Sequence, residues 1–327
     1  MAASRGRSSY HTLHLGPVSR AMSPRQSHWL EKFTVQAAIV ATLAAGYFLL
    51  YPFVRPSDSQ TALAFLAVGG AGRVAGFAIG LLIFAAASAL LTVSARPCGT
   101  ILVAVLGTGA VAMRSPEFST LLWLRQDNFG ALFRLLIAET VLLGALLFVA
   151  VMVIRQARAL AGRLTPRLAW HPSGSPKSPE RPRDASRLAA GLGPWGRSFL
   201  SAALTLLVGL AAVAVLLQSA HRGQVLFALL ASFAVAAWLA NRLLPAPHVE
   251  AYLLAPLVAA VLFYALASVA SYGSQPEAWA NVPLYARALP IDWLTAGCGG
   301  AMLGCWIGQR MEDAKLLDQA EEQQKGD

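Results

Sequence analysis

The sequence has few charged residues, and almost none of them interrupt its long apolar runs. Asp, Glu, Lys and Arg make up 13% of the 327 residues, against 56% hydrophobic residues. Soluble globular domains carry about 25% charged residues. The composition therefore excludes an ordinary water-soluble fold and indicates an integral membrane protein.

Catalytic and metal-binding patterns are also missing. The sequence contains no GxSxG, HExxH or Walker A pattern, and its six histidines all fall outside the apolar runs. Cys298 and Cys305, two of the three cysteines, are separated by about 10 Å along a helix axis, which is beyond the reach of a disulfide bond. We therefore expect structural cysteines, no catalytic residue, no metal and no cofactor, and we lean against an enzyme.

The apolar runs themselves are long enough to cross a bilayer. A hydrocarbon core about 30 Å thick needs roughly 20 apolar residues in a helix. We therefore predict an all-α integral membrane protein with eight transmembrane helices. The third is the shortest, and if it does not cross, the count becomes seven and the C-terminus changes side. The runs are residues 33–53, 74–95, 97–113, 131–154, 198–218, 224–244, 249–271 and 289–308.

Basic residues indicate the orientation, because Lys and Arg are retained on the cytoplasmic side of a span. With eight spans and the N-terminus inside, 19 of the 26 Lys and Arg fall on the inner side. We therefore predict a multi-pass protein of a bacterial cytoplasmic membrane with both termini cytoplasmic. Residues 1–30 are rich in Arg and Ser and contain no acid, so a transit peptide is the alternative interpretation of the N-terminal tail.

Five segments follow from this topology. Residues 1–32 form a disordered cytoplasmic tail, 33–154 a first four-helix half, 155–197 a basic linker, 198–308 a second four-helix half, and 309–327 an acidic cytoplasmic tail. The linker is Pro- and Ser-rich and carries nine basic residues, which predicts disorder and contact with anionic lipid headgroups. The net charge of +10 is unaccompanied by any nucleic-acid-reading motif, so we expect no nucleic acid partner.

An internal duplication is suggested by the second span of each half. Residues 75–97 can be laid over residues 225–247, and both stretches end in a proline at an inner turn. With an even number of spans in each half, the two copies would be parallel. We therefore expect two parallel four-helix halves.

Glycine recurs every fourth residue in two of the expected spans. Small residues at this spacing lie along one stripe of a helix and let two helix backbones approach closely in lipid. We predict packing within the monomer, with the interface of a homo-oligomer as the alternative. The two stripes are Gly72, Gly76 and Gly80 in the second span, and Gly300, Gly304 and Gly308 in the last.

Glu139 is the acidic residue that lies deepest in an apolar run. It stands eight residues into the fourth span, about 12 Å from its outer end. A charged acid at this depth costs about 2.5 kcal/mol or more, and it usually marks a pathway or a paired site. Arg73, at the outer end of the second span, is the predicted partner. A neutral, hydrogen-bonded structural Glu is the favoured interpretation, and a role in handling protons or cations is the alternative.

Charged residues of the outer loops form the last candidate site. Arg125, Asp127, Arg287 and Asp292 are predicted to face the outer side, where they could converge on one polar cleft. From Glu139 and the glycine stripes we expect a permease-like or transport-associated component without covalent chemistry. A structural or assembly subunit of a membrane complex is the first alternative, and a membrane enzyme acting on a lipid at the outer face is the second.

Overall fold

The computed structural model describes residues 24–56, 61–125, 128–164, 193–272 and 278–326. These residues form helices and connecting turns, and no strand occurs among them. Most of the expected N-terminal tail and the Pro/Ser-rich middle of the linker lie outside the described residues. The expected linker is helical at its two described ends, because α6 continues to Leu164 and α7 begins at Pro194.

Six helical stretches of the described chain are long and apolar enough to cross a membrane, which confirms the all-helical membrane class. A seventh is added if α4 (Pro97–Met113) and α5 (Phe118–Leu124), which are bent by 56°, form one broken span. The predicted number of eight spans is not confirmed. The six stretches are Trp29–Val54, Ala71–Leu91, Phe129–Leu164, Pro194–Leu216, Arg222–Leu243 and Val249–Val269.

The first of these stretches combines α1 (Pro24–Ala45), the π-helical turn η1 (Gly46–Leu50) and α2 (Tyr51–Val54). The next ones are α3 (Ala71–Leu91), α6 (Phe129–Leu164), α7 (Pro194–Leu216) and α8 (Arg222–Leu243). The last joins the 3-10 turn η4 (Val249–Leu253) to α9 (Leu254–Val269). Many of their outward-facing side chains are apolar and exposed, as lipid contact requires.

The expected eighth span consists of α10 (Pro290–Asp292), the π-helical turn η7 (Trp293–Gly297) and the first part of α11 (Cys298–Gly326). It is not among the six stretches, because its glycines and Asp292 lower its hydropathy. Nearly every residue from 288 to 306 is buried, and α11 packs between α8 and α4. Protein rather than lipid surrounds this segment, so it does not need an apolar outer face.

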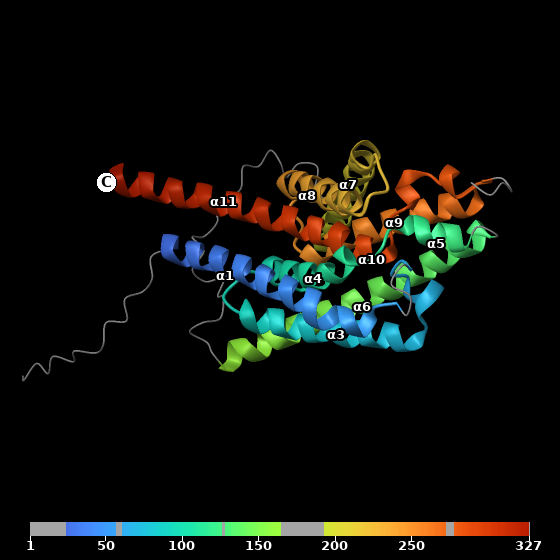
Figure 1. Cartoon of the computed structure of the whole chain (residues 1–327). Helices are drawn as coiled ribbons and strands as arrows, with labels where there is room; N and C mark the ends of the chain where they lie inside the picture. Colours follow the sequence, from blue (N-terminus) through green and yellow to red (C-terminus); the bar gives the residue numbers. More distant parts are fainter. Residues whose placement is uncertain (1–23, 57–60, 126–127, 165–192, 273–277, 327) are drawn as a thin grey trace, which may run out of the picture.

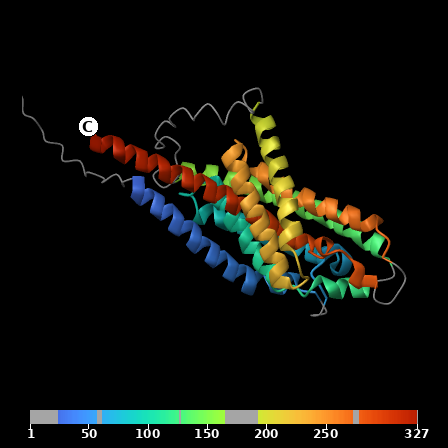
Figure 2. The same ribbon diagram turned by 90° about the horizontal axis from the view of Figure 1, so that it is seen from above.

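Helix α4 is buried to a similar degree and packs against α1, α3 and α11. The two halves of the chain do not share one packing pattern, since α1 packs mainly on α4 whereas α7 packs mainly on α8. In the view of Figure 2, α7 and α8 run across the bundle between α1 and α9. The predicted duplication stays a prediction.

A short irregular segment enters the bundle between α2 and α3. Residues 61–64 are not helical, and they lead into the π-helical turn η2 (Phe65–Gly69). Ala62, Leu63, Ala64 and Phe65 are all buried. We refer to residues 61–69 as the buried segment. Gly70 follows it with φ +83°, a left-handed conformation that favours glycine, and α3 begins at the next residue.

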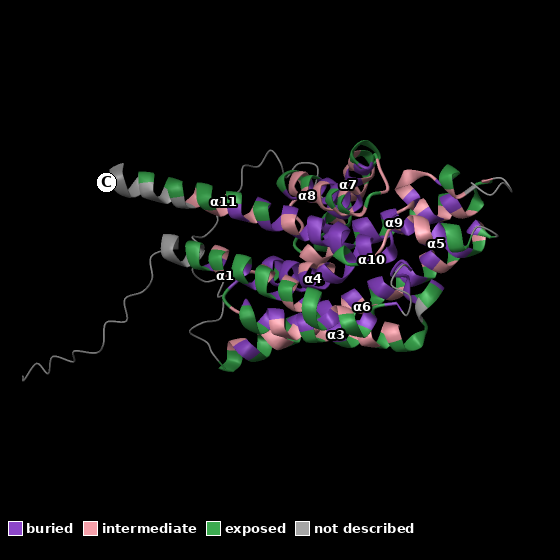
Figure 3. Ribbon diagram, in the orientation of Figure 1, coloured by how far each residue is buried: buried purple, intermediate pink, exposed green. Residues whose placement is uncertain are grey.

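Both ends of the described chain point to one side of the bundle. Figure 1 shows α1 starting and α11 ending at the same side, with α11 projecting beyond the other helices. We call this the termini side and its opposite the far side. Burial is concentrated along the middle of the bundle in Figure 3, and the projecting part of α11 is largely exposed.

Candidate functional site

Glu139 accepts a hydrogen bond from the backbone of the buried segment. Its side chain, on α6, is fully buried, and Oε2 lies 2.9 Å from the amide nitrogen of Leu66. Its other oxygen, Oε1, has no hydrogen-bond partner in the described part of the chain. The first amides of a helix lack intrahelical partners, so the carboxylate serves as a cap for η2 supplied by another helix.

The predicted pairing of Glu139 with Arg73 does not occur among the described residues. A guanidinium nitrogen of Arg73, Nη1, instead donates to the carbonyl of Val68 at 3.3 Å, in an exposed position. The reason is local. The buried segment brings its own backbone N–H to Glu139, while Arg73 remains near the surface, where a guanidinium stays hydrated at little cost.

Ser115 meets a second amide of the buried segment. This serine lies in the turn between α4 and α5, and its hydroxyl oxygen accepts from the amide of Leu63 at 2.9 Å. Non-helical backbone at membrane depth is tolerated only where protein groups satisfy it. Ser115 and Glu139 provide these acceptors from two different helical regions. The sequence did not reveal this role, since Thr61–Gly69 was assigned to an outer loop.

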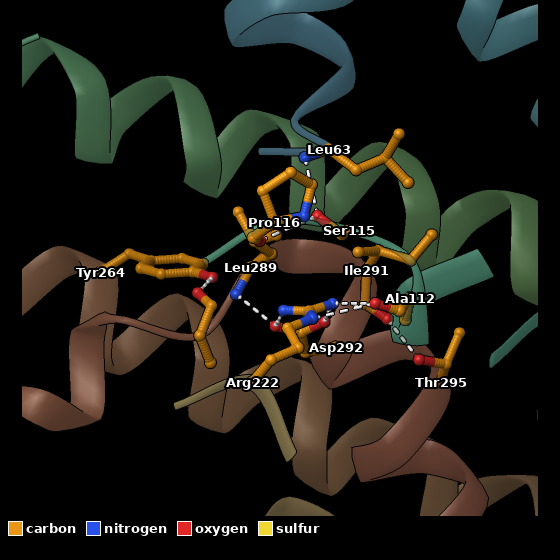
Figure 4. Close-up of polar contacts among 11 residues, drawn as sticks. Leu63, Ala112, Ser115, Pro116, Arg222, Tyr264, Leu289, Ile291, Asp292 and Thr295 are labelled. Atoms are coloured by element: carbon orange, nitrogen blue, oxygen red, sulfur yellow. Dashed lines mark hydrogen bonds and ion pairs between the residues drawn. The ribbon is translucent and has the colours of Figure 1, made fainter. Parts of the chain in front are cut away.

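The most extensive buried polar contact joins Arg222 to Asp292. Arg222 Nη1 donates to Asp292 Oδ2 at 2.6 Å, and Nη2 contacts the other carboxylate oxygen. The side chain of Asp292 is fully buried and that of Arg222 is 14% exposed. Figure 4 shows the pair surrounded by α4, α8 and α10, close to the contact between Leu63 and Ser115.

Further backbone groups complete this pair. Arg222 Nε donates to the carbonyl of Ala112 at 2.9 Å, at the end of α4, and Asp292 Oδ2 accepts from the amide of Leu289 at 2.8 Å. The carboxylate thus caps α10, whose first turn contains Pro290, and the guanidinium satisfies a carbonyl at a helix end. Arg222 was not predicted as a site residue, because its partner Asp292 lies 70 residues away in the sequence.

The outer-loop cluster predicted from Arg125, Asp127, Arg287 and Asp292 does not assemble among its described members. Arg125 Nη2 donates to the carbonyl of Ala67 at 3.1 Å. Arg287 donates to two carbonyls of its own loop, at 2.8 and 2.7 Å, and burial lowers the pKa of its guanidinium. Asp292 is buried with Arg222, and Asp127 lies outside the described residues. Each described charge is therefore used locally to satisfy backbone or to form one ion pair.

The second glycine stripe lies against the backbone of α8. A methyl group added at Gly300 would overlap the carbonyl of Leu230, and one added at Gly304 would overlap the carbonyl of Ala234. At Gly308 the nearest atom would be the amide nitrogen of Asn241, at 2.7 Å. These contacts lie within one chain, so the close approach of α11 to α8 requires glycine at Gly300 and Gly304.

The first glycine stripe is packed unevenly. A methyl group at Gly76 would lie 3.3 Å from the carbonyl of Phe53, and one at Gly80 would overlap the side chain of Leu50. Gly72 has nothing within 4 Å of the position of an added methyl group. Gly72 stands at the exposed first turn of α3, so close packing at this glycine stays a prediction.

The three cysteines are free thiols, and all are buried. Cys98, on α4, donates to the carbonyl of Met302 at 3.3 Å and also contacts Cys305, so these thiols bring α4 and α11 together. Cys298 donates to the carbonyl of Leu253 at 3.6 Å. No group of three His, Cys, Asp or Glu side chains suited to a metal occurs in the described ranges.

A cavity of about 490 Å³ opens at the termini side of the bundle. Its lining comes from α4, α6, α8 and the turn after it, η4 and α11, and includes Arg96, Cys98, Arg155, Arg158, Asn241 and Glu250. Arg155 and Glu250 form an ion pair across it. We call it the termini-side cavity. Glu139 does not line it. The cavity could not be predicted from the sequence, because its walls are distant in the chain.

Comparison of the chain with protein-family models, with curated proteins and with solved structures gave no match. Function is therefore argued from the arrangement of these residues.

Proposed function

We propose that the chain is a polytopic membrane protein without covalent chemistry of its own, and that it acts as a structural or assembly component of a membrane complex. One observation carries the proposal: the two acids that are fully buried among the described residues, Glu139 and Asp292, each bond to backbone at a break between helices. Carboxylates that are hydrogen-bonded to backbone in this way are unsuited to exchanging protons or cations along a path.

The projecting part of α11 supports a partner. It continues well past the packed glycines to Gly326, and Met311 on it is 42% exposed. A helix that leaves the bundle with its side chains largely unburied gains packing from a second protein. A homo-oligomer built through this helix is one form of such a complex, and a different membrane subunit is another.

Purification of the full chain in a mild detergent tests this proposal. We expect it to elute as an oligomer or together with another membrane protein. A chain that stops after Lys315 removes most of the projection while retaining Asp313, which pairs with Arg96 at 2.6 Å. This shortened chain is expected to lose the partner and keep its fold. A full chain that stays monomeric and copurifies with nothing would end the proposal.

A permease-like role is the second candidate, because the termini-side cavity is of the size that small-molecule sites have. Carbodiimide labelling of Glu139 across pH, with Glu139→Gln as the control, separates the two. Labelling that titrates with pH would favour ion-coupled transport, and absence of labelling at every pH favours the structural role. The lipid enzyme is not carried further, since Arg125, Arg287 and Asp292 have separate partners.

For the topology we propose eight crossings in a bacterial cytoplasmic membrane, with both termini cytoplasmic and α10–α11 as the eighth. The bias of basic residues supports this orientation, as does the position of both described ends at the termini side. Anionic headgroups are the proposed lipid partners of the 155–197 linker. Alkaline phosphatase fused at residues 273–277 is expected to be active, and fused after residue 327 inactive; the reverse result would contradict the orientation.

A further inference from the structure

Arg158 is a cation held by hydrogen bonds to neutral groups, and the acid that acts on it, Glu31, does so from beyond ion-pair distance. Its Nη1 donates to the carbonyl of Thr92 at 3.0 Å and to the hydroxyl of Thr100 at 2.6 Å, and its Nη2 donates to the carbonyl of Ala95 at 2.6 Å. These acceptors are neutral. No carboxylate oxygen lies within ion-pair distance of Arg158 in the ranges that the structure describes.

The position of this guanidinium is unusual for an uncompensated charge. Arg158 is half-buried at the end of the membrane bundle and lines the termini-side cavity. A charge withdrawn from water is costly unless an opposite charge compensates it. The carbonyls of Thr92 and Ala95, at the C-terminal end of α3, fix the direction of the side chain and supply partial negative charge. They supply no full negative charge, so an anion in the cavity would compensate the guanidinium further.

The remainder of the cavity favours an anion. Among its described lining residues, Arg96, Arg155 and Arg158 outnumber Glu250 and Glu312, and of the three Arg96 is paired with Asp313 outside the lining. Arg155 neutralises Glu250 through its Nη2, and a guanidinium has five N–H donors in all. Arg155 and Arg158 stand three residues apart on α6, which places them on the same face of the helix.

Helix α4 adds to this field. It begins at Pro97 beside the cavity, and its N-cap residue, Arg96, makes no side-chain cap hydrogen bond. The N-terminus of a helix carries partial positive charge. The N-terminus of α4 thus adds positive potential to a site that is formed by the cavity and Arg158.

We infer that the termini-side cavity is a binding site for a phosphate ester, whose oxyanion is held by Arg158 and Arg155. Guanidinium groups match the geometry of phosphate oxygens through paired N–H donors. The cavity, at about 490 Å³, is larger than phosphate alone requires, so it has room for the group esterified to it. That ligand can come from a soluble phosphate ester or from a phospholipid headgroup.

Thermal unfolding of the full chain in a neutral detergent, followed by tryptophan fluorescence, tests the site. Inorganic phosphate is expected to raise Tm of the wild type in a saturable way, relative to chloride of equal ionic strength. Arg158→Gln should weaken phosphate binding about tenfold or more, since hydrogen bonds to charged groups are among the strong ones. Arg163→Gln, an exposed position on the same helix outside the cavity, should bind phosphate as the wild type does.

Two further variants test the site if Arg158→Gln does not fold. Arg158→Lys keeps the positive charge but loses the paired N–H donors of the guanidinium group. This variant should bind phosphate more weakly than the wild type. Arg155→Gln leaves the contacts of Arg158 to Thr92 and Ala95 intact and should also weaken binding. Equal saturable shifts in the wild type and in every folded cavity variant would overturn the inference, as would equal shifts with phosphate and chloride.

The source of the phosphate ester is identified with two probes in the same assay. A rise in Tm with glycerol phosphate, lost in Arg158→Gln, supports a soluble ligand. A rise only with phosphatidylglycerol added to the micelles, likewise lost in Arg158→Gln, supports a headgroup. If neither probe raises Tm of the wild type, the assignment of a phosphate ester is rejected.

Discussion

The guanidinium of Arg222 and the carboxylate of Asp292 form a two-pronged contact between residues 70 positions apart in the chain. The carboxylate is fully buried, and it also accepts from the amide of Leu289. This arrangement fixes the start of α8 to the start of α10. Because both charges are withdrawn from solvent, the pair is sensitive to the loss of either member.

Removing one member of this pair is expected to be costly. Asp292→Asn keeps the shape of the side chain but leaves Arg222 without a counter-charge, which should lower the free energy of unfolding by about 3–5 kcal/mol. Unfolding in mixed micelles measures the change. The double variant Arg222→Leu/Asp292→Leu removes both charges and is expected to lose less. Arg134→Gln, an exposed position on α6, is the control. A loss for Asp292→Asn no greater than for this control would contradict the role of the pair.

We expect Glu139 to stabilise the fold by accepting a hydrogen bond rather than by carrying a negative charge. Glu139→Gln retains a side-chain oxygen for the amide of Leu66 and should cost less than about 1 kcal/mol. Glu139→Ala leaves the partly buried amide of Leu66 without this acceptor, which costs about 1–3 kcal/mol, and it also creates a void. The same unfolding assay compares the two. Equal losses for Gln and Ala would show that hydrogen bonding to the buried segment is unimportant.

The glycines are expected to differ sharply in their tolerance of alanine. Gly304→Ala places a methyl group against the carbonyl of Ala234, so α8 and α11 must separate, at a cost of about 1–3 kcal/mol. Gly72→Ala meets open space and should be neutral or stabilising by up to about 1 kcal/mol, because alanine is the better helix former. Similar effects of the two substitutions would contradict the described packing of α11.

The thiols are expected to be protected by the fold. Cys98, Cys298 and Cys305 are buried, so a maleimide should react with none of them in the native protein and with all three after denaturation in SDS. Mass spectrometry counts the added groups. Rapid labelling of Cys298 in the native state would mean that the centre of the bundle is open to solvent.

The sequence predicted the helical membrane class from features that act locally. Apolar run length reflects bilayer thickness, which is why the stretch 33–53 corresponds to Trp29–Val54 and the stretch 198–218 to Pro194–Leu216. Run length did not distinguish a helix facing lipid from one enclosed by protein. The glycine-rich run 289–308 lies in the centre of the bundle, and its low hydropathy is the signal that could have indicated this.

The candidate sites were predicted less completely, because their partners are distant in the chain. Glu139 was identified as an exceptional acid, but its partner is the amide of Leu66, 73 residues away. Arg73 was chosen as a partner by charge alone, whereas a backbone amide has no signature in the sequence. The apolar stretch TALAFLAVG within an expected outer loop was the available signal that this loop enters the bundle.

The polar content of residues 290–308 has a consequence for how the chain enters a membrane. An acid and a series of glycines make this segment a weak candidate for insertion on its own. Its counter-charge, Arg222, and the surface that its glycines contact both belong to α8, which is synthesised earlier. In the proposed eight-span topology, insertion of this segment would depend on α8 already being in the bilayer, and a defect in α8 would appear first as a failure to insert residues 290–308.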